Sequence, residues 1–215
     1  MKIAVIGAGN VGGTLGRRWS NAGHEVVFGV RDPAAEKTRK LIAACAEGTS
    51  AALPADAAAD AEVVVLAIWW HVAEEVILGL GDLAGKVLID CTNPLDENLQ
   101  LTHGHTESGG EMIADWAPTA RVVKAFNTVP WEAMADPEYG GQHPTLFFCG
   151  GDEFAAETVR ALILDIGFEP CYVGGIEMSR YLEPLAALWI MACRIRQPGT
   201  DFAVRLIGRN GEGPQ

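Results

Sequence analysis

Three glycines near the start of the chain have the spacing of a phosphate-binding turn. Gly7, Gly9 and Gly12 form the pattern G-x-G-x-x-G after the apolar run 2–6 and before a helix-like stretch. The first glycine of such a turn permits a tight bend, the second lets a pyrophosphate approach the backbone, and the third lets the helix pack on the strand. Free amides and the helix dipole then hold the phosphates. The pattern predicts a dinucleotide site; the alternative is a tight turn that binds nothing.

The end of the next expected strand carries a base where an acid is usual. NAD-binding sites place Asp or Glu there, about 20 residues past the glycines, to bind the ribose hydroxyls. This chain has Arg31, whose planar guanidinium pairs with a 2′-phosphate, and Lys37 or Arg39 adds charge nearby. The nearby acid, Asp32, precedes Pro33 and is expected to cap a helix. The pattern favours NADP(H) over NAD(H), unless Arg31 is only a solvated loop residue.

Three loops expected at the carboxyl ends of strands combine aromatic, small polar and proline residues. They are 68–71, 91–95 and 127–131. Ligands of open α/β sheets bind beyond these strand ends, so the loops can hold a nicotinamide against another flat ring. Trp69 and Trp70 have the alternative role of packing in the core or an interface. The residues that we assign to the cofactor in these loops are Ile68, Trp69, His71, Thr92, Asn93 and Pro94.

Acid–base and metal chemistry have weak signals in this sequence. His71 is the best placed of the five histidines, because it follows an expected strand at its carboxyl end. His103 and His105 lie in a polar loop with too few neighbouring ligands for a metal site, so we expect no metal. The chain has no G-x-S-x-G, no H-E-x-x-H and no clustered carboxylates suited to hydrolysis.

Strand-like and helix-like segments alternate along the chain. This order predicts a Rossmann-type α/β fold, a doubly wound and mostly parallel sheet with a small C-terminal helical extension. We divide the chain into an NADP-binding Rossmann domain, 1–150, and a C-terminal sheet extension and helix, 151–215, expected to carry the acceptor site and a dimer contact. The expected strands are 2–6, 25–29, 49–53, 62–68, 87–90, 121–126, 145–149 and 169–173. The expected helices are 11–22, 33–47, 71–80, 152–166 and 178–194, and 91–110 is expected to be a loop.

The composition limits the classes of function. Of 215 residues, 49% are apolar, which allows a substantial core, and the net charge of −12 disfavours binding to nucleic acid. No apolar run approaches the roughly 20 residues that span a bilayer, and no signal peptide is evident. Five scattered cysteines without a C-x-x-C pair indicate reduced thiols in a cytoplasmic protein. The expected helix 178–194 is apolar on most faces, which favours a homodimer over a helix buried under the loops.

Several motifs spread over about residues 1–205 occur here together. They are M-K-I-A-V-I-G-A-G-N-V-G, V-R at the end of the second strand, A-I-W-W, C-T-N-P-L, V-K-A-F-N-T-V and S-R-Y-L-E-P-L. In this combination the chain resembles the NADPH-dependent reductases of the deazaflavin coenzyme F420. The resemblance extends to the cytosolic reductase domains of the six-transmembrane metalloreductases, which pass hydride from NADPH to a flavin.

The resemblance implies an NADP(H)-dependent oxidoreductase that transfers hydride between nicotinamide and a deazaflavin or flavin-like small-molecule acceptor. Direct transfer between stacked rings needs little acid–base chemistry. The deazaflavin reductases have a histidine where this chain has Asn127, the metalloreductases have asparagine there, and a family serine is replaced by Val30. The resemblance assigns Gly9, Asn10, Val11, Arg31, Ile68 and Trp69 to NADP(H), and Asn127, Thr128, Ser179 and Leu182 to the second cofactor.

The acceptor stays open at this point. Another NADPH reductase, acting on a quinone, an imine or a ketone, fits the same motifs, and so does a non-enzymatic NADP(H)-binding sensor. The side chains that are candidates for a role at the reacting centre are those of His71, Asn127 and Ser179.

Overall fold

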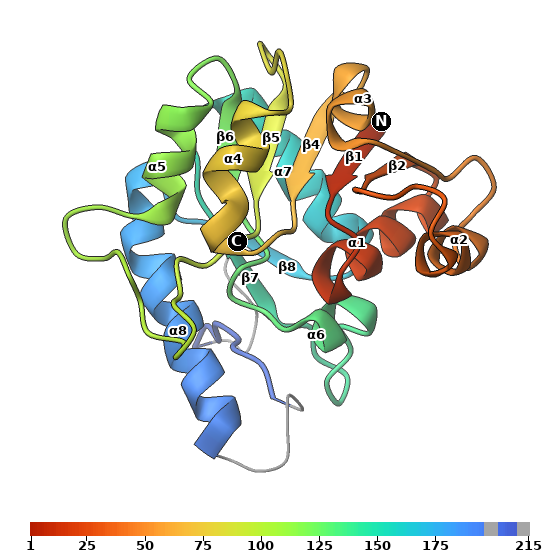
Figure 1. Ribbon diagram of the computed structural model, residues 1–215. Helices are drawn as coiled ribbons and strands as arrows, with labels where there is room; N and C mark the ends of the chain where they lie inside the picture. Colours follow the sequence, from red (N-terminus) through yellow and green to blue (C-terminus); the bar gives the residue numbers. More distant parts are fainter. Residues whose placement is uncertain (196–201, 210–215) are drawn as a thin grey trace.

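A parallel sheet forms the centre of the computed structural model, which describes residues 1–195 and 202–209 (Figure 1). Its six described strands lie in the order β3-β2-β1-β4-β5-β6. This is the strand order of the Rossmann fold. All six strands are parallel, but successive strands are added on one side of β1 up to β3 and on its other side from β4 onward. The predicted fold class is therefore confirmed. The strands are β1 (Lys2–Ile6), β2 (Glu25–Gly29), β3 (Ser50–Ala52), β4 (Val63–Leu66), β5 (Val87–Asp90) and β6 (Arg121–Lys124).

Two further parallel strands extend this sheet at the β6 edge. β7 (Thr145–Phe148) pairs with β8 (Glu169–Tyr172). An antiparallel bridge between Lys124 and Cys149 joins the pair to β6, with both backbone hydrogen bonds formed at 2.8 and 3.0 Å. A sheet extension was expected after residue 150, whereas β7 lies before that residue and only β8 after it. The division into two domains stays a prediction.

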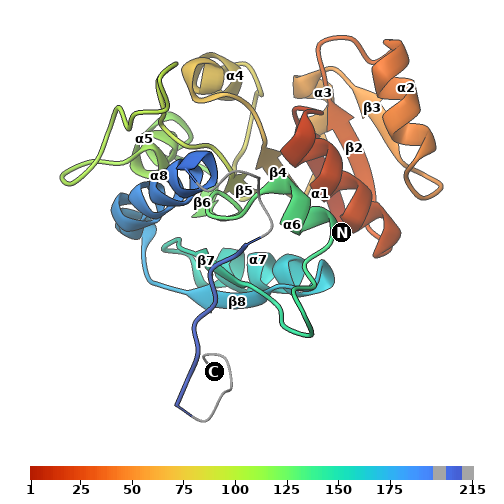
Figure 2. The ribbon, with the colours of Figure 1, turned by 90° about the horizontal axis from the view of Figure 1, so that it is seen from below.

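Helices cover both faces of the sheet (Figure 2). One layer holds α3, α4 and α5, and the opposite layer holds α1, α6 and α7, while α8 lies beside α5. The helices are α1 (Asn10–Asn21), α2 (Glu36–Ala43), α3 (Pro54–Ala59), α4 (Ala73–Leu78), α5 (Gly109–Trp116), α6 (Trp131–Ala135), α7 (Glu153–Asp165) and α8 (Ser179–Ile195), with 3-10 turns η1 (Trp70–Val72) and η2 (Ile176–Met178).

Each layer buries its own apolar core against the sheet. Strands such as β4 are buried at every position, as expected for parallel strands covered on both faces. Trp19 is the largest side chain of the α1–α7 core; its indole N–H donates to the carbonyl of Leu162 at 3.0 Å, and its ring meets Phe126 edge-on. These contacts fix the C-terminal part of α1 relative to α7 and to the loop that follows β6. No helix in the described ranges is long and apolar enough to cross a membrane.

Some predicted boundaries were wrong, for local reasons. The helix expected over 33–47 begins only at Glu36, because Asp32 closes a turn with the amide of Ala34 instead of capping the helix. The same helix ends at Ala43. The segment 71–80 is divided between η1 and α4. The loop expected to reach residue 110 ends at Ser108, whose hydroxyl caps α5.

Candidate functional site

The glycine turn has the geometry that its spacing predicts. Gly7 has a φ of +102°, and a Cβ placed on it would lie 2.4 Å from the carbonyl oxygen of Ala67. A Cβ on Gly12 would lie 2.1 Å from the carbonyl oxygen of Gly7. A Cβ on Gly9, in contrast, would meet nothing within 4 Å. The outer glycines therefore build the turn, and Gly9 leaves open space beside the backbone.

The N-terminus of α1 is free to bind an anion. Gly9 is its N-cap, no side chain caps it, and its first turn carries no acid. First-turn amides of a helix have no intrahelical acceptor, and they point outward with the positive end of the helix dipole. Asn10 and Val11 are the first two residues of this turn.

Arg31 lies beside the glycine turn. Gly29, the last residue of β2, pairs with Ile6, the last residue of β1, so the segments after both strands start from the same edge. Arg31, Lys37 and Arg39 are exposed, and no ion pair within the described ranges involves any of them. Exposed, unpaired cations that follow the strand next to the glycine turn suit a second phosphate group.

The loop after β4 contributes one aromatic ring to the surface and one to the core. The side chain of Trp69 is 76% exposed. Trp70 instead stacks on Trp116 with ring centroids 5.5 Å apart, and it meets His103 edge-on. The packing role considered for Trp70 is therefore confirmed, while Trp69 is free to cover a ligand. His71 is exposed in η1 and lies outside the pocket described next.

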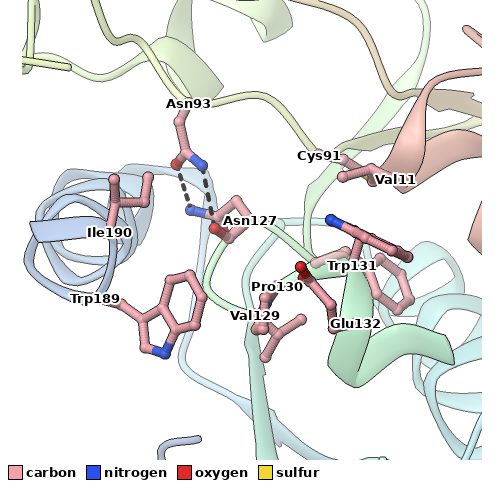
Figure 3. Close-up of a pocket in the computed structure, with 11 residues that line it drawn as sticks. Val11, Cys91, Asn93, Asn127, Val129, Pro130, Trp131, Glu132, Trp189 and Ile190 are labelled. Carbon is pink, nitrogen blue, oxygen red and sulfur yellow. Dashed lines mark hydrogen bonds between the residues drawn. The ribbon is translucent and has the colours of Figure 1, made fainter. Parts of the chain in front are cut away.

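A pocket of about 280 Å³ opens beyond the carboxyl ends of β5 and β6 (Figure 3). Its walls come from the start of α1, the loops after β5 and β6, and helices α6 and α8. The volume lies at the low end of the roughly 300–1,000 Å³ typical of small-molecule sites, so the pocket suits a ring rather than a whole dinucleotide. The residues that line it are Val11, Cys91, Asn93, Phe126, Asn127, Val129, Pro130, Trp131, Glu132, Trp189 and Ile190.

Asn93 and Asn127 meet in the wall of this pocket. The Asn93 side-chain amide donates to the backbone carbonyl of Asn127, and the Asn127 amide donates to Asn93 Oδ1, each at 3.1 Å. The Asn127 amide also donates to the carbonyl of Leu182 in α8, at 3.3 Å. The preceding residue, Phe126, has a φ of +65°, which is rare for a bulky residue and turns the chain out of β6. Of the residues assigned from sequence, the structure thus brings Val11, Asn93 and Asn127 together.

Other assigned residues support this wall from behind. Thr92 is buried, and its hydroxyl donates to Asp90 at 2.7 Å, while the carbonyl of Pro94 accepts from the backbone and hydroxyl of Thr102. Ser179 is buried with its hydroxyl 3.4 Å from the Cys149 sulfur, and it does not line the pocket. Thr128 is buried next to Asn127. Leu182 contributes its backbone carbonyl, which accepts from the Asn127 side-chain amide.

A buried ion cluster lies beneath the same loops. Lys124 Nζ lies 2.6 Å from Asp90 Oδ2 and 2.8 Å from Glu183 Oε1, and it donates to the carbonyl of Thr92 at 3.0 Å. Burial alone would lower the pKa of Lys124, but the two carboxylates outweigh burial and raise it above its usual value. The cluster joins β5, β6 and α8 and so holds the pocket walls in register.

The cysteines near the pocket are unsuited to nucleophilic chemistry. Burial raises the pKa of the Cys149 thiol to about 11, against its usual 9.0. Burial also raises the pKa of the Cys91 thiol, and the nearby Asp90 charge adds to the effect. Both thiols are therefore protonated at neutral pH. The described residues contain no group of histidine, cysteine and carboxylate side chains that could hold a metal ion.

Sequence reasoning did not single out several pocket residues. Trp131 was noticed only as part of a loop and Trp189 only as part of an apolar helix. Glu132 and Ile190 carry no motif of their own, and Cys91 was noticed only as the first residue of C-T-N-P-L. The roles of the α6 and α8 residues depend on both helices reaching the same pocket, which no local pattern specifies.

Comparisons with known proteins agree with this geometry. The family model described as NADP oxidoreductase coenzyme F420-dependent matches residues 2–94. The crystal structure of a putative F420-dependent NADP-reductase from Arthrobacter sp. FB24 is 33% identical with a TM-score of 0.89, covering 97% of this chain and 100% of that one. A reductive aminase from Aspergillus terreus, solved in complex with NADPH and ethyl levulinate, has 22% identity and a TM-score of 0.66 over 90% of this chain and 62% of that one, and shows the fold alone.

A longer protein shares the same unit. Metalloreductase STEAP3 of Rattus norvegicus is 30% identical over 186 residues, which are 86% of this chain and 36% of that protein. The chain spans about a third of the length of the curated relatives it matches. These relatives are oxidoreductases, and so is the protein described here. Identity of one third along the full length of the Arthrobacter protein, together with the matching family model, shows that the chain belongs to the family of coenzyme F420-dependent NADP oxidoreductases.

Proposed function

We propose that the chain binds NADP(H) along the glycine turn and transfers hydride between its nicotinamide and a flat acceptor, a deazaflavin such as F420 or a flavin. One observation carries the proposal: the pocket begins at Val11, directly after the turn, and ends at Trp189 and Ile190 of α8. A dinucleotide held at the turn therefore has a ring-sized space next to it. The description of the Arthrobacter protein as a putative F420-dependent NADP-reductase supports the same chemistry.

Arg31 is the residue that we propose to select NADP(H). Its guanidinium presents a planar fork that matches a phosphate, and it stands unpaired beside the glycine turn. Lys37 adds a second exposed charge in the first turn of α2. Together they would neutralise the charge of the 2′-phosphate, which NAD(H) lacks.

The remaining proposed roles are orientation and exclusion of water. Bound NADPH supplies a hydride, and the reduced acceptor takes up one proton from solvent. Ile68, which packs against Gly7, and the exposed Trp69 would cover the cofactor. The apolar lining formed by Val11, Val129 and Ile190 keeps water away from the reacting rings. Direct transfer needs no side-chain base, so the exposed position of His71 is compatible with activity.

We also propose a cytoplasmic homodimer. Tyr181 and Leu188 of α8 are each 68% exposed. Large exposed side chains of this kind on one helix are typical of a surface that binds another protein. A second copy packed there would bury them, and sedimentation equilibrium tests this point. The five cysteines are all free, in keeping with a reducing compartment.

Stopped-flow kinetics with NADPH and a panel of acceptors tests the proposed function. The panel holds F420, riboflavin, a quinone, a cyclic imine and a ketone. We expect rapid NADPH oxidation with F420 or riboflavin. Turnover only with the quinone, the imine or the ketone would overturn the proposed acceptor class. Tight NADPH binding without turnover on any acceptor would overturn hydride transfer and favour a sensor.

A further inference from the structure

The C-terminal segment, defined here as residues 202–206, contacts a residue that lines the pocket. Phe202 packs against the indole of Trp189, with 5.6 Å between the ring centroids and 34° between the ring planes. Trp189 is one of the two α8 residues in the pocket wall. A part of the chain that follows α8 and contributes no side chain to the pocket lining is therefore in contact with that wall.

Three contacts attach the C-terminal segment to β7 and β8. The amide of Thr145, the first residue of β7, donates to the carbonyl of Val204 at 3.0 Å. The amide of Leu206 donates to the Thr145 hydroxyl at 3.0 Å. The guanidinium of Arg205 pairs with Glu169 of β8 at 3.0 Å, and both side chains are partly buried. The segment therefore runs beside β7, as Figure 2 shows in dark blue.

The direction of β7 places these contacts at the pocket end of the sheet. Cys149, which follows β7, bridges antiparallel to Lys124 of β6, so Thr145 lies beyond the carboxyl end of β6. Alternate residues of a strand present their backbone groups to opposite edges, so Thr145 and Cys149 use the same edge of β7. The chain leaves this edge after β6, where the positive φ of Phe126 turns it away. The carbonyl of Val204 fills the place that β6 leaves open.

Packing, and not a hydrogen bond, sets the orientation of the Trp189 indole. Its nitrogen is shielded from solvent and has no hydrogen-bond partner in the part of the chain that the structure describes. In Figure 3 the six-membered ring of the indole faces Asn127, and the nitrogen faces away from it. A side chain without a hydrogen bond keeps its position only through the atoms packed against it, and Phe202 supplies an aromatic ring for this purpose.

We infer that the C-terminal segment completes the acceptor pocket: its contacts with β7 and β8 hold Phe202 in place, and Phe202 holds the Trp189 ring in the pocket wall. Phe202 is thus a positioning residue that acts through Trp189. The inference rests on the proposed function, since it takes the pocket to hold the flat acceptor. If the attached segment favours acceptor binding by some factor, the bound acceptor favours attachment of the segment by the same factor.

Charge reversal at the ion pair tests the inference in the full-length protein. Arg205→Glu places two carboxylates side by side and should release the segment, so hydrogen exchange at the Thr145 amide should become faster. The KM for F420 or riboflavin should rise about fivefold, or about 1 kcal/mol, which is the size of one aromatic contact. The kcat at saturating acceptor and the NADPH dissociation constant should stay within about twofold, because only acceptor binding is affected. Adding Glu169→Arg restores the pair and should reverse both changes.

Phe202→Ala tests the aromatic contact while keeping the three attachments. It should raise the acceptor KM as Arg205→Glu does, whereas Phe202→Tyr, which keeps the ring, should stay close to wild type. Saturating acceptor should slow exchange of the Thr145 amide in the wild-type protein. The matched control is Arg160→Glu, which places the same like charges together beside Glu157 on α7 and should leave the acceptor KM unchanged.

The possible failures are distinct. An unchanged acceptor KM in Phe202→Ala, unchanged Thr145 exchange in Arg205→Glu, or a KM increase that Glu169→Arg does not reverse would overturn the inference and leave the proposed function standing. An equal loss of NADPH affinity in Arg205→Glu would also overturn it, because the effect would then be a general loosening of the fold. No reduction of F420 or riboflavin by the wild-type protein would overturn both.

Discussion

Asn93 and Asn127 form two hydrogen bonds with each other beyond the ends of the neighbouring strands β5 and β6. Each side-chain amide donates to an oxygen of the other residue at 3.1 Å. The pair is the point at which the loops after β5 and β6 become one wall of the pocket. Asn127 is only 6% exposed, and its side-chain amide also donates to the carbonyl of Leu182. A substitution at Asn93 therefore removes some of the hydrogen bonds that position Asn127 and leaves the one to Leu182.

We therefore expect Asn93→Ala to act on both stability and turnover. Loss of the two hydrogen bonds should lower the free energy of unfolding by about 1–3 kcal/mol. The freed Asn127 amide should lower kcat/KM for the acceptor about tenfold, as expected when a positioning contact is lost. Urea unfolding and steady-state kinetics measure the two effects. Asn98→Ala, on an exposed residue of the same loop, is the control, and an equal loss of activity there would contradict the argument.

Alanine substitutions in the glycine turn should separate folding from binding. Gly12→Ala places a Cβ 2.1 Å from the carbonyl of Gly7, so we expect a destabilised or unfolded protein. Gly9→Ala meets nothing within 4 Å, and its φ of −79° suits alanine. Gly9→Ala should keep its unfolding free energy within about 1 kcal/mol and lose NADPH affinity at least tenfold. Thermal unfolding measures the stability of both variants, and NADPH titrations measure their affinity. Unchanged NADPH affinity in Gly9→Ala would show that the phosphates do not bind at this turn.

Arg31→Ala should discriminate between the two nicotinamide dinucleotides. A charge-assisted hydrogen bond is worth about 1.5–3 kcal/mol, so NADPH binding should weaken by roughly that amount while NADH binding stays nearly unchanged. Isothermal titration calorimetry with both dinucleotides measures the difference. Arg31→Lys keeps the charge without the planar fork and should lie between wild type and Arg31→Ala. Equal losses for NADPH and NADH would refute the 2′-phosphate role.

The strands were largely predictable because their signals are local. Runs such as Val63–Leu66 are apolar at every position, and the glycine turn fixes where β1 ends and α1 begins. The short helices were missed, although α5 carries a capping box: the Ser108 hydroxyl accepts from the Glu111 amide and donates to its carboxylate. The strand expected to reach Phe126 ends at Lys124, because the positive φ of Phe126 is set by tertiary packing.

The pocket was predictable only in part, for a related reason. Val11, Asn93 and Asn127 follow strand ends, and the rule that ligands bind there identifies them. Glu132 and Trp189 reach the pocket because α6 and α8 pack at the same edge of the sheet. Ser179 belongs to a motif of the family, yet in this chain its hydroxyl faces Cys149. Contacts across such distances in sequence leave no periodic signal.

The buried ion cluster predicts a large stability effect. Lys124→Met would leave Asp90 and Glu183 buried without their shared cation. Removing one partner of a buried pair costs about 3–5 kcal/mol, so we expect the free energy of unfolding to fall by that amount. Lys40→Met, in an exposed pair with Glu36, should change it by less than about 1 kcal/mol. Urea unfolding measures both free energies. Similar losses in both variants would show that the buried cluster contributes no more to stability than an exposed ion pair.

Cys149 should make the stability depend on pH in the alkaline range. Burial raises its pKa from 9.0 to about 11 in the folded protein. Between these values the unfolded thiol loses its proton while the folded one keeps it, so unfolding becomes easier as pH rises. Relative to Cys149→Ala, wild type should therefore lose about 2–3 kcal/mol between about pH 8 and pH 11. Urea unfolding of both proteins across this range measures the difference, and a difference independent of pH would show that the thiol ionises equally in both states.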